Sequence, residues 1–117
     1  MAVVSFDIDG TMEFGHPPGP VTVAFVRDLA ERGHVIGSAS DRTRTDQSEL
    51  WELHGIAAAF VGGKHVLHDV RERFPAGPHV HIGDTHVDEH YARLAGFDFL
   101  WPGQVETLRL DPDPRSY

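Results

Sequence analysis

The stretch AVVSFDIDGTM, residues 2–12, decides how the rest of the chain is interpreted. Its first five residues form an almost entirely apolar run of strand length, which is typical of a strand buried on both faces of a parallel sheet. Asp7 and Asp9 follow this run, and Gly10 then breaks the extended pattern. Because side chains two positions apart on extended backbone share a face, the sequence predicts two carboxylates that point the same way where the first strand ends.

Strand-like and helix-like segments alternate after a glycine- and proline-rich loop at residues 13–20. We expect helices at residues 20–32, 46–54, 64–74 and 87–96. We expect further strands at residues 34–40, 56–61, 79–83 and 97–101. Pro20 suits the first turn of the first helix, and Asp46 with Glu49 forms a capping pair for the second. The alternation predicts an α/β fold: a single Rossmann-like domain whose five-stranded parallel sheet carries helices on both faces.

Size and composition limit the class of protein. The 117 residues suit one domain, residues 1–117, in which we expect residues 110–117 to be a frayed tail. The chain has no cysteine, which excludes disulfides, thiolate nucleophiles and cysteine-ligated zinc. Its net charge of −8 argues against general binding to nucleic acid. No secretory signal and no apolar run of about 20 residues is apparent, so we expect a cytoplasmic protein that does not enter membranes.

Polar side chains follow the first, second and fourth expected strands, and a lysine follows the third. These residues are Asp7, Asp9, Ser40, Lys64, Asp84 and Asp88. Because ligands of parallel α/β sheets bind beyond the carboxyl ends of the strands, we expect these side chains to meet at one edge. The carboxylates repel one another unless a cation lies between them, and hard oxygen ligands of this kind suit Mg²⁺. The ammonium of Lys64 and the hydroxyl of Ser40 can then hold the oxygens of a phosphoryl group.

The same stretches resemble, in order, the four motifs of the haloacid dehalogenase (HAD) superfamily. DIDGT at residues 7–11 is similar to the first motif, DxDGT, and VIGSAS at residues 35–40 is similar to the second, a strand that ends in serine or threonine. Lys64 stands where the lysine of the third motif belongs, and HIGDTHVD at residues 81–88 is similar to the fourth, a strand that ends in GDxxxD. Ordinary loops and helices fill the intervals between the motifs. The resemblance therefore implies a small HAD-like phosphatase-type member with no cap domain.

The resemblance also implies a mechanism: hydrolysis of phosphoric monoesters through an aspartyl-phosphate. Asp7 is then the nucleophile. Asp9 protonates the leaving oxygen and afterwards deprotonates the attacking water. Gly10 and Thr11 shape the turn beside the substrate. A halide leaving group needs no proton, so the second aspartate favours phosphoryl transfer over cleavage of a carbon–halogen bond.

The metal ligands that the resemblance implies are acidic. Mg²⁺ is held by the carboxylates of Asp7 and Asp84 and by the backbone carbonyl of Asp9. Asp88 orients Lys64 or a metal-bound water. Aspartates at the start of a helix are also favoured by the helix dipole alone, an interpretation that is compatible with metal binding.

The expected contacts to a phosphorylated substrate include two alternatives that the sequence leaves open. Ser40 is the hydroxyl of the second motif, although Ser38 competes with it two residues earlier. Arg42 and Arg44 are the candidate substrate contacts beyond the motifs, and a solvated basic loop is the competing interpretation. Lys64 is the only lysine, whereas the other nine basic residues are arginines, and this favours a role that needs a compact ammonium.

Three other interpretations compete with the phosphatase. Four histidines in HVHIGDTHVDEH can bind zinc at such spacings, although the third element of the known HxHxDH pattern is displaced here. These are His79, His81, His86 and His90. A receiver-like phospho-acceptor domain has a similar size and similar residues, but receivers place their lysine last, whereas Lys64 precedes Asp84 here. The third alternative is a catalytically idle HAD-fold binding module.

The physiological substrate and the oligomeric state are not encoded in these motifs. Phe99 and Trp101, near the last expected strand, are candidates for the interface of a homo-oligomer. A site without a cap is open, which suits a bulky substrate or a neighbouring subunit that covers it. A phosphomutase must shield its intermediate from water, so an open site argues against that activity.

Overall fold

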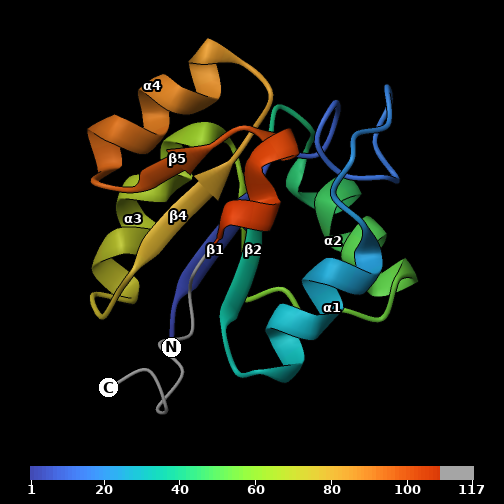
Figure 1. Cartoon of the computed structure of the whole chain (residues 1–117), viewed down its shortest axis with the longest axis horizontal. Helices are drawn as coiled ribbons and strands as arrows, with labels where there is room; N and C mark the ends of the chain where they lie inside the picture. The colour runs from blue at the N-terminus through green and yellow to red at the C-terminus, as the bar shows by residue number, and fades with distance from the viewer. Residues whose placement is uncertain (109–117) are drawn as a thin grey trace.

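Five parallel strands form one sheet in the order β3-β2-β1-β4-β5 (Figure 1). The strands are β1 (Val3–Phe6), β2 (Val35–Ala39), β3 (Phe60–Gly62), β4 (His79–Ile82) and β5 (Asp98–Leu100). The computed structural model describes residues 1–108, so the tail expected at residues 110–117 lies outside the described residues. The prediction of a five-stranded parallel sheet is confirmed, with β1 at its centre.

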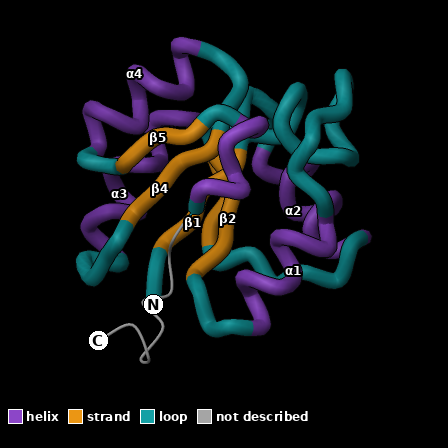
Figure 2. Tube along the Cα trace, in the orientation of Figure 1, coloured by secondary structure: helices purple, strands orange, loops and turns teal. Residues whose placement is uncertain are grey.

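A helix follows each of the first four strands (Figure 2). The helices are α1 (Val23–Glu31), α2 (Arg44–Leu53), α3 (Leu67–Arg73) and α4 (His86–Ala95), with short 3₁₀ helices η1 (Lys64–Val66) and η2 (Pro102–Thr107). The expected α/β alternation is therefore confirmed. Loops and these helices alone connect the strands within residues 1–108. None of the helices in the described part of the chain has the length and apolar character needed to cross a membrane.

Helices cover both faces of the sheet. Val4 and Phe6 of β1 face a cluster that contains Val26 of α1 and Trp51 of α2. Val3 faces the other way, into a second cluster built from α3 and α4. This alternation follows from the period of two along a strand, and it explains why the first strand is apolar on both faces. Figure 1 shows α1 and α2 on one side of the sheet and α3 and α4 on the other.

The starts of α1 and α2 differ from the sequence-based prediction. Thr22 is the N-cap of α1, so Pro20 lies before the helix and not in its first turn. Thr43 is the N-cap of α2, and its hydroxyl accepts a hydrogen bond from the backbone N–H of Asp46. The predicted Asp46–Glu49 capping pair is therefore wrong. Threonine hydroxyls on extended backbone satisfy the free N–H groups of a first helical turn, and this local geometry decides the boundary.

The third strand is shorter and later than expected, covering Phe60–Gly62 in place of residues 56–61. The three alanines at residues 57–59 have little preference for a strand, although the N–H of Ala59 still donates to the carbonyl of Ile36 at 2.7 Å. Gly37 of β2 lies opposite Phe60, and a Cβ at residue 37 would lie 2.5 Å from the Phe60 ring. The absence of a side chain at Gly37 thus lets the Phe60 ring lie against β2.

Candidate functional site

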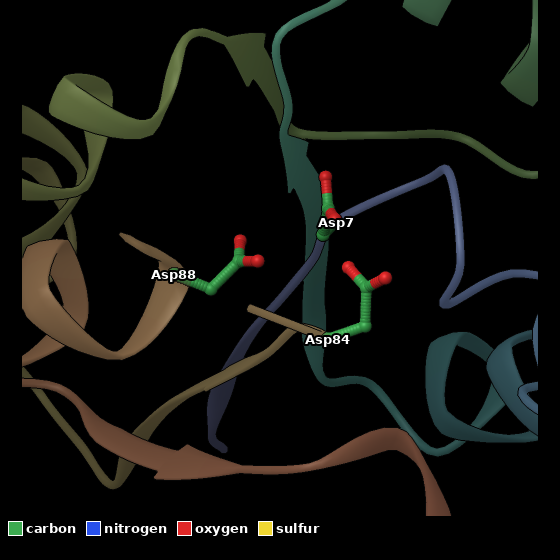
Figure 3. Close-up of side chains that lie close together, drawn as sticks. All are labelled: Asp7, Asp84 and Asp88. Atoms are coloured by element: carbon green, nitrogen blue, oxygen red, sulfur yellow. The ribbon is translucent and has the colours of Figure 1, made fainter. Parts of the chain in front are cut away.

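Three aspartates come together where β1 and β4 end. Asp7 follows β1, Asp84 follows β4, and Asp88 lies in the first turn of α4. One oxygen from each carboxylate lies within 4.8 Å of the others, and Figure 3 shows the three groups turned toward a common space. Asp7 and Asp88 are buried and Asp84 is exposed, so the group is open to solvent on one side. The predicted meeting of acidic side chains at this edge is confirmed for these three residues, and the group can hold a metal ion. The expectation that Asp9 points the same way as Asp7 is wrong, because its carboxylate lies against Arg42.

Two glycines leave the space that these carboxylates occupy. Gly10 has a φ of +78°, and a Cβ there would lie 1.9 Å from Oδ2 of Asp84. A Cβ at Gly83 would lie 2.3 Å from Cγ of Asp88. Glycine is favoured at residue 10 for two reasons: other residues are disfavoured at that φ, and a side chain there would displace the Asp84 carboxylate. The expectation that Gly10 shapes the turn after the first strand agrees with this geometry.

Asp88 is fixed by two neighbouring side chains. Its Oδ1 lies 2.9 Å from Nε2 of His81, and its Oδ2 accepts a hydrogen bond of 2.7 Å from the Thr85 hydroxyl. Thr85 also caps α4, since its Oγ1 accepts from the N–H of Asp88. Burial alone raises the pKa of Asp88, but the hydrogen bonds from His81 and Thr85 and the charges of His81 and Lys64 outweigh it, so the pKa is lowered. Asp88 is therefore held as a carboxylate.

Lys64 brings the only lysine ammonium of the chain to this group. It is 7% exposed at the start of η1, and its Nζ lies 3.5 Å from Oδ1 of Asp88 and 3.7 Å from Oδ2 of Asp41. Burial lowers the pKa of Lys64, but the charges of Asp88, Asp7 and Asp41 outweigh it and raise the pKa. A buried cation thus remains charged beside the acidic group, where it can meet an anion.

Asp7 has the opposite electrostatic environment from Asp88. Burial, the charge of Asp88 and the hydrogen bond with Asp84 raise the pKa of Asp7 to about 8, against the lowering effect of Lys64. The pKa is raised because ionised Asp7 would be a second negative charge close to Asp88 in a region that excludes water. A cation between the carboxylates removes this repulsion, so metal binding favours the ionised form of Asp7.

Asp9 lies apart from the three clustered aspartates. Its carboxylate is 37% exposed and is bound by the guanidinium of Arg42 through contacts of 2.8 to 3.2 Å. The N–H of His16, in the glycine- and proline-rich loop, donates to Oδ1 at 2.8 Å. The Arg42 hydrogen bonds are the main cause of a lowered pKa at Asp9. Arg42, predicted as a substrate contact, is therefore engaged by Asp9 in this structure.

The two serines of β2 and its end have different neighbours. The Ser38 hydroxyl donates to Oε1 of Gln47 at 2.6 Å and accepts from Nε1 of Trp51 at 2.9 Å, so it belongs to a buried polar network under α2. Ser40 follows β2, and its Oγ accepts from the N–H of Arg42 at 3.1 Å. Ser40 lines a pocket of about 340 Å³ together with Lys64, which places it on the side of the acidic group.

Thr11 and Arg44 complete the predicted set of site residues. Thr11 is buried in the turn after β1, where its N–H donates to the carbonyl of Ile8 and its Oγ1 has no hydrogen-bond partner among residues 1–108. Arg44 is exposed at the first position of α2, and no contact in the described part of the chain connects it to the acidic group. The structure therefore gathers Asp7, Asp84, Asp88 and Lys64, with Ser40 beside them.

His81 and Thr85 are the supporting residues that sequence reasoning missed. His81 is fully buried, with Nε2 against Asp88 and Nδ1 2.9 Å from the Ser5 hydroxyl. Its alternation with His79 in HVHI was the available signal, but the pattern was interpreted as a rival zinc site. His79 lies against the carbonyl of Phe74 instead, and the histidines of residues 1–108 contribute to no group able to hold a metal.

The arrangement combines hard oxygen ligands, a buried ammonium and a hydroxyl at one edge of a parallel sheet. Such a combination suits a cation and an anion bound side by side. No family model matches the chain, and no curated protein is similar to it.

Proposed function

We propose that the protein is a Mg²⁺-dependent phosphatase that hydrolyses phosphoric monoesters through an aspartyl-phosphate on Asp7. The observation that carries the proposal is the convergence of Asp7, Asp84 and Asp88 within 4.8 Å, with Nζ of Lys64 3.5 Å from Asp88. The order of the four stretches that resemble HAD motifs supports the same activity. Neither kind of support identifies the natural substrate, because fold and function are separable.

The residues present fit Mg²⁺. This ion prefers carboxylates and water, and it commonly binds through one or two carboxylates together with substrate phosphate. Asp7 and Asp84 are suited to contact it directly, and Asp88, fixed by His81 and Thr85, is suited to orient Lys64 or a bound water. When bound, the ion supplies positive charge that offsets the charge of the carboxylates and of the phosphoryl oxygens.

The chain's own residues then divide the reaction into two displacements. A carboxylate oxygen of Asp7 attacks phosphorus, the bond to the leaving oxygen breaks, and the leaving oxygen takes a proton from Asp9. Water next attacks phosphorus, loses its proton to Asp9, and breaks the bond to Asp7, which releases phosphate and restores the enzyme. Lys64 and Ser40 stabilise the oxygens of the transferred group in both steps.

The ion pair with Arg42 bears on the role of Asp9. A carboxylate held ionised by an arginine is ready to accept a proton from water in the second step. To donate a proton in the first step, Asp9 must first separate from Arg42. Substrates whose leaving group needs no proton avoid this requirement, so they are the most informative first probes.

The sheet order favours the phosphatase over the receiver-like alternative. Receivers such as CheY have the flavodoxin-like order 2-1-3-4-5, whereas the order here is 3-2-1-4-5. The acidic group is also complete, which gives no support to an idle binding module.

The test is the release of phosphate from p-nitrophenyl phosphate and ethyl phosphate with Mg²⁺ or with EDTA. We expect Mg²⁺-dependent turnover that falls by about 1,000-fold or more in Asp7→Asn, because the nucleophile is lost. Asp98→Asn is the matched control, since Asp98 is exposed at the start of β5, the opposite end of the strands from the site. Unaltered turnover in Asp7→Asn, or no Mg²⁺-dependent turnover of either ester, would overturn the proposal.

A further inference from the structure

A recess continues from the candidate site along the surface between η1, α3 and α4. The pocket of about 340 Å³ beside Ser40 and Lys64 is also lined by His65, Val87 and Tyr91. A second pocket, of about 270 Å³, is lined by Lys64, His65, His68, Tyr91, Leu94 and Ala95. Because the two pockets share Lys64, His65 and Tyr91, they form one groove that leads away from the buried ammonium.

One wall of this groove is an apolar stripe on α4. Val87, Tyr91 and Leu94 are spaced by four and three residues, so they lie on one face of the helix. Val87 is 52% exposed and Leu94 is 68% exposed, although the protein is strongly acidic and most exposed side chains are polar. Apolar side chains that remain exposed beside a site are a common mark of a binding groove.

The opposite wall is made by η1 and α3. The His65 ring lies close to the backbone of Gly63: a Cβ at residue 63 would lie 2.8 Å from the ring. His68 lies farther out on α3, with its Nε2 3.4 Å from Glu72. The ring of His65 and the phenol of Tyr91 therefore both border the junction of the two pockets, next to Lys64.

We propose that this groove, lined by His65, Tyr91 and Leu94, binds the leaving group of the substrate, and that the substrates are phosphomonoesters of aromatic or apolar alcohols. The inference rests on the proposed phosphatase function. A phosphoryl group held at Lys64 lies at the inner end of this groove, so the rest of the ester can extend between His65 and Tyr91 toward Leu94. The residues that line the outer pocket include no acid, and its far end is apolar at Leu94 and Ala95, which favours an apolar leaving group.

A third pocket, between α2 and β3, is a weaker candidate for the same role. It measures about 480 Å³ and is lined by Trp51, Ile56, Phe60 and neighbouring residues of α2 and β3. None of its lining residues belongs to the acidic group or to the pocket beside Lys64. A leaving group attached to a phosphoryl group at Lys64 therefore has no continuous path into it.

The test compares benzyl phosphate with ethyl phosphate in the presence of Mg²⁺. Both esters release alkoxides of similar basicity, so the ratio of their kcat/KM values reports recognition of the ring rather than chemical reactivity. We expect benzyl phosphate to be preferred by at least about tenfold, as is usual for apolar subsites. In Leu94→Ser and in Tyr91→Ala, we expect this ratio to fall toward one.

Leu53→Ser is the matched control, because Leu53 is also an exposed leucine at the end of a helix, at 76% exposure, but lies on α2. It should leave the ratio unchanged. Equal kcat/KM values for the two esters, or an equal fall of the ratio in Leu53→Ser, would overturn the subsite. A third outcome would also overturn it: Leu94→Ser leaves the ratio unchanged, and sedimentation shows that the same substitution dissociates an oligomer. The apolar stripe would then bind a second copy of the chain.

Binding of phosphonates separates this inference from the proposed function. Calorimetry with benzylphosphonate and ethylphosphonate requires no turnover. If neither ester is hydrolysed, the phosphatase proposal fails, and the ratio of the two phosphonate dissociation constants still decides the groove: a preference of about tenfold for the benzyl compound supports it, and equal binding refutes it.

Discussion

The Asp9 carboxylate binds both the side chain of Arg42 and the backbone N–H of His16. Arg42 approaches from the loop after β2, and the N–H of His16 approaches from the loop after β1. Together they lower the pKa of Asp9. Because its pKa is lowered, Asp9 stays ionised at a pH below the ordinary pKa of an aspartate. In the proposed reaction, it can therefore still accept a proton from water at that pH.

Replacement of Arg42 by glutamine is therefore expected to change the pH dependence of turnover. A lowered pKa returns toward its ordinary value when its cause is removed, so the acidic limb of the kcat profile for p-nitrophenyl phosphate, which includes hydrolysis of the intermediate, should move to higher pH. The profile is measured between pH 3 and pH 8, a range of about five units around the ordinary pKa of aspartate. Arg71→Gln is the control, because Arg71 lies on α3 and donates to the carbonyl of Pro75. An acidic limb that stays in place would remove Asp9 from the role of base.

Single residues differ in how well the sequence predicts them. Asp7 and Asp84 were predictable because each closely follows a strand whose apolar pattern is clear, and Lys64 stood out as the only lysine. The Asp9–Arg42 pair was not predictable, since the direction of a long arginine side chain depends on how two loops fold against each other. His81 was misinterpreted for a related reason: a buried histidine on a strand can satisfy a carboxylate as well as a metal.

At the scale of elements, the N-cap of α4 has a second role that the N-cap of α1 lacks. Thr85 and Thr22 both accept a hydrogen bond in the first turn of their helices, but only the Thr85 hydroxyl also donates to Asp88. Replacing either by alanine should lower the free energy of unfolding by about 1 kcal/mol. Only Thr85→Ala should also weaken Mg²⁺ binding, by about tenfold, because it releases a contact that positions Asp88 beside the proposed metal site.

Two measurements separate these effects: urea unfolding for stability and calorimetric titration with Mg²⁺ for affinity. Thr85→Ser, which keeps the hydroxyl, should restore both properties. An equal Mg²⁺ affinity for Thr85→Ala and Thr22→Ala would show that the contact with Asp88 is only structural.

The elements themselves were largely predictable, and their boundaries were not. Apolar periodicity identified every strand and helix that the proposed site depends on. The predicted starts of α1 and α2 were wrong because Thr22 and Thr43 take the N-cap positions, whereas neighbouring proline and acidic residues also favour a helix start. The third strand moved because alanines 57–59 carry too weak a preference to define one.

At the scale of the whole molecule, the raised pKa of Asp7 links stability to pH and to metal. The folded protein keeps the Asp7 proton up to about pH 8, whereas the unfolded chain releases it near its ordinary value of 3.8. The folded state therefore binds this proton more tightly between these values, so the stability of the metal-free protein decreases as the pH rises through that window. The lowered pKa values of Asp9 and Asp88 act below pH 4, outside the window.

The test is urea unfolding in EDTA at about pH 6 and about pH 9, compared between the wild type and Asp7→Asn. The asparagine variant lacks this proton, and the other titrating groups are common to both proteins, so the difference isolates Asp7. We expect the stability of the wild type to decrease more than that of the variant between the two pH values. We also expect Mg²⁺ to stabilise the wild type more at the higher pH, where Asp7 is ionised. Equal pH dependence of the two proteins would contradict the raised pKa.

The overall architecture shows where sequence reasoning reaches its limit. Alternating strands and helices predicted a parallel sheet with helices on both faces, because parallel strands require crossover connections. The order 3-2-1-4-5 was not predicted, since it depends on which face each helix covers. That order is nevertheless what brings the ends of β1 and β4 side by side and so unites Asp7 with Asp84.

The solitary lysine has a practical consequence. Its ε-amine is sheltered at 7% exposure and lies against carboxylates, while every other cationic side chain is a guanidinium or an imidazole. Reagents that acylate lysine thus have one internal target, and its rate of modification becomes a direct gauge of whether an anion occupies the adjoining space. The protein carries its own reporter group, without an introduced label.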